Sequence, residues 1–61
     1  MDFTNLVVFI TGASNGIGKQ LAVNLATRGA IVVGCGRSHD RLVETLKEVR
    51  KFSPKSLMIA C

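Results

Sequence analysis

The sequence has 61 residues and a net charge of +4, from eight lysines and arginines against four acidic residues. A chain of this length forms one small domain at most and buries only about 60% of the surface that it exposes when unfolded. Cys35 and Cys61 lie in no CxxC or Cys/His pattern, so we expect reduced thiols and no metal site. The cations are spread along the chain and the aromatic residues are three phenylalanines, which argues against a nucleic-acid partner.

The beginning of the chain carries no recognisable targeting signal. Asp2 stands where a signal peptide is positively charged, and the apolar run LVVFI is too short for the core of a signal peptide or for a membrane span. The sequence therefore predicts a cytoplasmic protein that does not enter a membrane.

The first half of the chain predicts a strand and a helix. The continuous apolar run LVVFI is typical of a strand buried on both faces, near 5–11. A helix is predicted near 17–28, ending at Gly29 as a C-terminal cap. Its apolar residues are spaced four apart, at Ile17, Leu21 and Leu25, with Ala22 and Ala26 beside them. The two alanines would let this helix lie close to a sheet.

The second half repeats the pattern. The run AIVV predicts a strand near 30–36, and SLMIAC predicts another near 56–61. Between them a helix is predicted near 39–52, with Ser38 as its N-cap and Ser53-Pro54 after its end. Its expected apolar stripe consists of Leu42, Val43, Leu46 and Val49.

The order strand, helix, strand, helix, strand predicts an α/β fold of βαβαβ type with a parallel sheet and right-handed crossovers. If the strands lie in chain order, both helices cover the same face and the other face stays bare. Proteins rarely leave so much apolar surface in water. We therefore expect residues 1–61 to be the N-terminal part of a larger doubly wound domain.

Residues 11–18 read TGASNGIG and lie where a ligand binds in an open α/β sheet. Gly12 can adopt a turn conformation closed to other residues, and Gly16 lets a bound group approach the backbone. Gly18 would permit close contact between helix and strand. Free N–H groups and the helix dipole favour a phosphate here. The spacing fits neither a Walker A loop nor the form GxGxxG, which leaves TGxxxGxG.

This motif, with the strand and helix offsets over essentially all 61 residues, resembles the short-chain dehydrogenase/reductase family. The resemblance implies a Rossmann fold in which the glycines shape a loop around the pyrophosphate of NAD or NADP. Ser14 and Asn15 would lie near the adenosine ribose and the phosphates, and the Ile17 N–H would bind the pyrophosphate. The alternative for Ser14 and Asn15 is ordinary turn chemistry, and for the glycines a purely structural turn.

The end of the second predicted strand bears on the choice of cofactor. NAD-specific Rossmann proteins usually place an acidic residue there, but this chain has Gly36, Arg37 and Ser38. The Arg37 guanidinium suits a 2′-phosphate, and Ser38 adds a hydroxyl at a helix N-terminus. We therefore expect NADP rather than NAD. The alternative is that Arg37 is a solvated surface cation.

The resemblance implies hydride transfer between NADP and a carbonyl or alcohol substrate, in a parent protein that is a homo-oligomer. The family's catalytic tyrosine has no counterpart, because the chain contains no tyrosine, so we assign no catalytic residue. Two alternatives stay open. One is a non-catalytic nucleotide-binding or regulatory protein, and the other is an inactive truncated product on the same half-fold.

Overall fold

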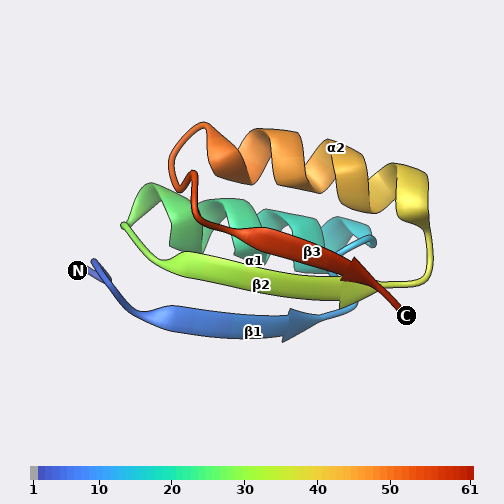
Figure 1. Cartoon of the computed structure of the whole chain (residues 1–61), viewed down its shortest axis with the longest axis horizontal. Coiled ribbons are helices and arrows are strands. Elements are labelled where there is room, and N and C mark those ends of the chain that lie inside the picture. The colour runs from blue at the N-terminus through green and yellow to red at the C-terminus, as the bar shows by residue number, and fades with distance from the viewer. Residues whose placement is uncertain (1) are drawn as a thin grey trace.

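The computed structural model describes residues 2–61, and its five elements alternate between strand and helix (Figure 1). They are β1 (Val7–Thr11), α1 (Gly16–Thr27), β2 (Ile31–Gly36), α2 (His39–Arg50) and β3 (Leu57–Ala60). The predicted α/β class and βαβαβ order are confirmed, and every element begins and ends within two residues of its expected bounds.

The sheet has three parallel strands in the order β1-β2-β3, as the sequence predicts. Val33 in β2 lies between Phe9 of β1 and Leu57 of β3. Because side chains alternate between the two faces of a strand, these three paired residues lie on the same face of the sheet. The carboxyl ends of all three strands meet at one edge, where the chain enters both helices.

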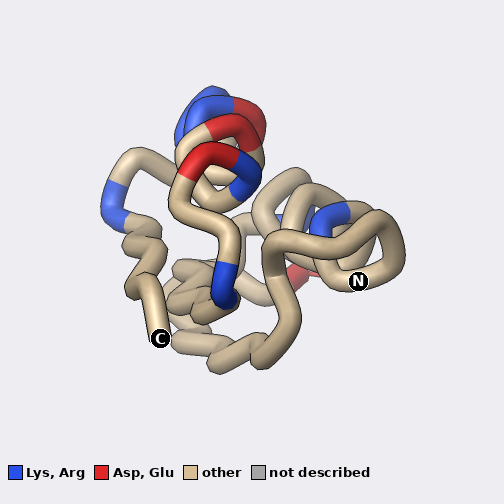
Figure 2. Tube along the Cα trace, turned by 90° about the vertical axis from the view of Figure 1, so that its right-hand side faces the viewer, with Lys and Arg blue, Asp and Glu red and all other residues tan. Residues whose placement is uncertain are grey.

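Both helices cover the same face of the sheet and lie side by side (Figures 1 and 2). The core between the layers is formed by Ile10, Ala13, Ala22, Ala26, Val32, Leu42 and Val49. The strands contain no charged residue, and Figure 2 shows the charges on the helices and loops. The charge pattern therefore separates a solvated helical layer from an apolar sheet.

The opposite face of the sheet is uncovered. The large apolar side chains that point from it are more than half exposed, namely Val7 at 64%, Phe9 at 61%, Leu57 at 52% and Ile59 at 51%. The prediction of helices on one face and a bare second face is confirmed.

The expected apolar stripe of α1 is wrong in part. Ile17 is 85% exposed and Leu21 is 49% exposed, whereas Ala22 and Ala26 are fully buried. The helix approaches the sheet so closely that only small side chains fit between the two layers. The larger side chains therefore lie along the flank of the helix, beside the unpaired edge of β1.

The buried stripe of α2 differs from the expected one at two positions. Leu42 and Val49 are buried as expected, but Val43 is 37% exposed and Thr45 is completely buried. Ser38 is the N-cap of α2, as predicted, because its hydroxyl oxygen accepts a hydrogen bond from the Arg41 N–H at 3.4 Å.

Candidate functional site

The loop that joins β1 to α1 turns sharply at Gly12. The φ angle of Gly12 is +71°, in the left-handed region that favours glycine. The Asn15 N–H donates to the Gly12 carbonyl at 3.2 Å and closes the turn. The conformation expected for Gly12 is therefore present.

The next residue, Ala13, holds the loop against the rest of the fold. It is completely buried, and its N–H donates to the Cys35 carbonyl of β2 at 2.9 Å. Its carbonyl accepts a hydrogen bond from the Thr45 hydroxyl of α2 at 3.2 Å. The loop is thus tied to a strand and to a helix. Sequence reasoning missed Thr45, because nothing in the local pattern relates it to a loop 32 residues earlier.

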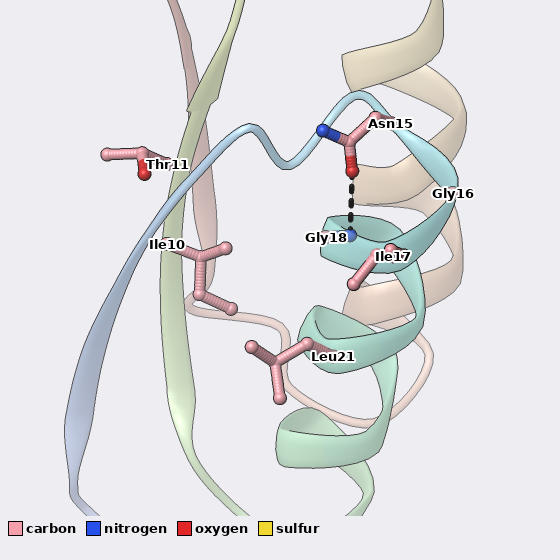
Figure 3. Close-up of a pocket in the computed structure, with 7 residues that line it drawn as sticks. All are labelled: Ile10, Thr11, Asn15, Gly16, Ile17, Gly18 and Leu21. Carbon is pink, nitrogen blue, oxygen red and sulfur yellow. Dashed lines mark hydrogen bonds between the residues drawn. The ribbon is translucent and has the colours of Figure 1, made fainter.

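The start of α1 presents two free amides. The Asn15 side chain caps the helix, since its Oδ1 accepts a hydrogen bond from the Gly18 N–H at 2.9 Å (Figure 3). The Lys19 N–H donates to the Asn15 carbonyl at 2.8 Å. Within residues 2–61, no acceptor lies on the N–H of Gly16 or Ile17. Together with the positive end of the helix dipole, these two donors form an anion-binding position.

Gly16 and Gly18 serve different purposes in this geometry. A Cβ at Gly18 would lie 2.1 Å from the Gly12 carbonyl oxygen, so the helix packs on the loop and not on a strand. The expected helix–strand contact at Gly18 is therefore wrong about the partner. A Cβ at Gly16 would meet nothing within 4 Å, which leaves open space over the free amides.

Two hollows flank the loop. The first, of about 500 Å³, lies at the free edge of β1 and is lined by Ile10, Thr11, Asn15, Gly16, Ile17, Gly18 and Leu21. Figure 3 shows the side chains of Ile17 and Leu21 on α1 pointing toward Ile10 on β1. The second hollow, of about 400 Å³, lies at the ends of β1 and β2 and is lined by Thr11, Gly12, Ser14, Asn15, Cys35, Gly36, Arg37 and Cys61.

The second hollow brings Ser14, Asn15 and Arg37 together, as the sequence predicts for a site built across two strand ends. Within residues 2–61 the Arg37 guanidinium makes no ion pair, because the one salt bridge found there joins other residues. Ser38 does not line the hollow. Sequence reasoning missed Gly36, where a Cβ would lie 2.6 Å from Ser14 Oγ, so the bare backbone of β2 lets Ser14 fit against it.

Other site types are less well supported by the described part of the chain. In residues 2–61 no three His, Cys, Asp or Glu side chains are grouped as a metal site would need. Neither α1 nor α2, the helices of that range, is long and apolar enough to cross a bilayer.

Comparison with known proteins decides the family. A family model described as short chain dehydrogenase matches residues 6–61. The chain belongs to the short-chain dehydrogenase family. It is 42% identical over 53 residues to an NADPH-dependent pterin aldehyde reductase of Arabidopsis thaliana, covering 87% of this chain and 22% of that protein. It is 43% identical over 47 residues to an L-xylulose reductase of Caenorhabditis elegans, covering 77% of this chain and 19% of the relative.

Solved structures agree with this assignment. A short-chain dehydrogenase/reductase from Mycobacterium marinum superposes with a TM-score of 0.87 at 38% identity, covering 98% of this chain and 24% of the other. The βαβαβ unit therefore corresponds to the N-terminal part of a short-chain dehydrogenase Rossmann fold. The chain spans only about a fifth to a quarter of the length of these relatives. Membership implies an NAD(P) cofactor.

Proposed function

We propose that residues 1–61 are the cofactor-binding part of an NADP(H)-dependent oxidoreductase. This protein would transfer hydride between the nicotinamide and a carbonyl or alcohol substrate. The observation that carries the proposal is the pair of free amides at Gly16 and Ile17, beside a hollow that contains an unpaired arginine. Phosphate groups are the ligands that such a helix N-terminus favours.

The geometry of the loop between β1 and α1 supports a position for each part of the cofactor. The pyrophosphate would accept hydrogen bonds from the Gly16 and Ile17 amides, above the open space that Gly16 leaves. The adenosine ribose would then lie in the second hollow, near Ser14 and Asn15. The Gly12 and Gly18 backbone would hold the loop in shape without touching the cofactor.

Arg37 supports NADP over NAD. Its side chain is exposed at the end of β2, lines the second hollow and makes no ion pair within the described residues. A planar guanidinium can donate two hydrogen bonds to a phosphate, whereas the ribose hydroxyls of NAD offer no anion. Ser38 would support the cofactor site indirectly, because its hydroxyl oxygen already accepts the capping hydrogen bond at the start of α2.

Two variants of the full-length protein test the cofactor preference. Arg37→Ala should weaken NADP binding by about tenfold to a hundredfold and leave NAD binding nearly unchanged, since hydrogen bonds to charged groups contribute ~1.5–3 kcal/mol. Arg37→Asp should weaken NADP further and strengthen NAD. Dissociation constants for both cofactors decide, with Lys47→Ala in the last turn of α2 as the control cation. Equal weakening of both cofactors in the two Arg37 variants would refute the NADP assignment.

The chain contains no tyrosine, so it has no counterpart of the family's catalytic tyrosine. The proton donor to the substrate would therefore come from other parts of the protein. A non-catalytic nucleotide-binding protein or an inactive truncated product is the second candidate. Oxidation of NADPH by the full-length protein with a panel of aldehydes and ketones separates the two. We also propose that the full-length protein is a homo-oligomer, as the family resemblance implies, and that it is cytoplasmic. Sedimentation and cell fractionation test these two proposals.

A further inference from the structure

The two cysteines of the chain come from different elements but line the same hollow. Cys35 lies in β2 and Cys61 directly follows β3, and both border the second hollow together with Arg37. Cys35 pairs with Ile59, so Cys61 is two residues beyond that partner and belongs to the same face of the sheet. The Cys61 N–H donates to the Gly36 carbonyl at 2.9 Å and holds the segment after β3 beside β2.

The two thiols lie close to each other at the border of the second hollow. The neighbouring Cys61 side chain raises the pKa of the Cys35 thiol above its ordinary value, and partial desolvation adds to the rise. Both cysteines are free, Cys35 half-buried and Cys61 exposed. Within residues 2–61, Cys61 is the more exposed of the two thiols, so we expect it to react first with a soluble oxidant.

We propose that Cys35 and Cys61 are a redox pair. A small-molecule disulfide such as oxidised glutathione oxidises them to an intramolecular Cys35–Cys61 disulfide, and this bond narrows the second hollow. The pair lies diagonally across two neighbouring strands, so the segment after β3 must move toward β2 for the bond to form. A disulfide formed there would lie at the border of the second hollow, which Arg37 also lines.

The reaction proceeds by two thiol–disulfide exchanges. The Cys61 thiolate attacks one sulfur of oxidised glutathione, which forms a mixed disulfide and releases one glutathione thiolate. The Cys35 thiolate then attacks the Cys61 sulfur and releases the second glutathione thiolate. The two protein thiols are oxidised, the glutathione disulfide is reduced, and the protons from Cys35 and Cys61 end on the two glutathione molecules. Excess reduced glutathione reverses both steps.

The effect on the cofactor rests on the proposed function. If the adenosine ribose lies in the second hollow, a disulfide at its border competes with it for space. Oxidation should then weaken NADP binding by about tenfold or more, which corresponds to ~1.4 kcal/mol. Bound NADP should in turn slow the formation of the disulfide.

The test uses the full-length protein in defined mixtures of reduced and oxidised glutathione. Peptide mapping by mass spectrometry should find Cys35 joined to Cys61, with loss of two hydrogen atoms, and reduced glutathione should restore both thiols. Persistence of both free thiols, or glutathione attached to either cysteine without the intramolecular bond, would overturn the inference.

Matched variants assign the order of attack and the effect on binding. Cys35→Ser should stop at a mixed disulfide on Cys61, and Cys61→Ser should form no cross-link and show the same NADP dissociation constant before and after oxidation. A wild-type protein that cross-links without any change in NADP binding would overturn the narrowing of the hollow. A reduced protein that binds no dinucleotide would refute the proposed function. The disulfide is detected by mass spectrometry, so its formation is tested separately from cofactor binding.

Discussion

Gly16 and Gly18 lie two residues apart at the start of α1, but a side chain would meet opposite surroundings at the two positions. At Gly18 a Cβ would lie 2.1 Å from the Gly12 carbonyl oxygen and 3.1 Å from the Ala13 Cα. These are backbone atoms that cannot rotate away. At Gly16 the space is empty. The first glycine is therefore available for a ligand, and the second is required by the fold.

This difference predicts that Gly18→Ala and Gly16→Ala separate stability from binding. Gly18→Ala should lower the free energy of unfolding by about 1–3 kcal/mol, the usual cost of overpacking. Gly16→Ala should leave that free energy unchanged or raise it by less than about 1 kcal/mol, because alanine suits a helix better than glycine. Its new methyl group should instead weaken NADP binding by about tenfold or more.

Chemical denaturation and NADP titration of the full-length protein measure both effects. The two variants control for each other, since each adds the same methyl group to the same turn. A Gly16→Ala protein that binds NADP as tightly as the wild type would contradict the proposed place of the pyrophosphate.

At the scale of the elements, the Thr45 side chain of α2 holds the loop that joins β1 to α1. The Thr45 hydroxyl donates toward the carbonyls of Ala13 at 3.2 Å and Arg41 at 3.0 Å, and the residue is completely buried. The other end of the Ala13 backbone donates to β2. Loss of the hydroxyl would leave the buried Ala13 carbonyl without its partner from α2.

Thr45→Val should therefore destabilise the protein by about 1–3 kcal/mol, the cost of leaving a buried polar group unpaired. It should also weaken NADP binding, because the loop loses its attachment to α2. Thr45→Ser is the matched control, since it keeps the hydroxyl and loses one methyl group at a cost of ~0.8 kcal/mol. Thermal unfolding and NADP titration compare the two. If Thr45→Ser weakens binding as much as Thr45→Val, the hydrogen bond to the loop is not the reason.

At the scale of the whole molecule, the isolated 61-residue chain has a bare sheet face and two unpaired strand edges. Apolar faces and free edges of this kind promote association. We expect the isolated chain to self-associate under reducing conditions and to lack a cooperative thermal transition as a monomer. The double variant Val7→Lys/Leu57→Lys should reduce the association, because both side chains lie on the bare face and neither contributes to the core.

Analytical ultracentrifugation and circular dichroism on the same samples measure association and unfolding together. Lys55→Glu serves as a control for solubility effects at an exposed site before β3. A wild-type 61-residue chain that sediments as a monomer and unfolds cooperatively would contradict this prediction, because it would be stable with this sheet face exposed to water.

Local sequence patterns specify the helices and strands, their order and the position of the loop between β1 and α1. These features depend on local patterns: apolar runs such as LVVFI form strands, the cap at Ser38 starts a helix, and parallel strands place residues 11–18 at one sheet edge. The conformation of Gly12 also follows from local chemistry, because only glycine readily adopts its positive φ. The glycine spacing, taken together with the strand and helix offsets over essentially the whole chain, indicated the family, which the comparisons confirm.

Which residues meet across the fold depends on tertiary packing and could not be read from local patterns. The close approach of α1 to the sheet buries Ala22 and exposes Ile17, although both fit the helical period. The link from Thr45 to Ala13 and the meeting of Cys35 with Cys61 depend on strand register and on the distance between the layers. Periodicity specifies which face of an element a residue occupies, but it does not specify what lies opposite. That depends on how side chains of different sizes pack together.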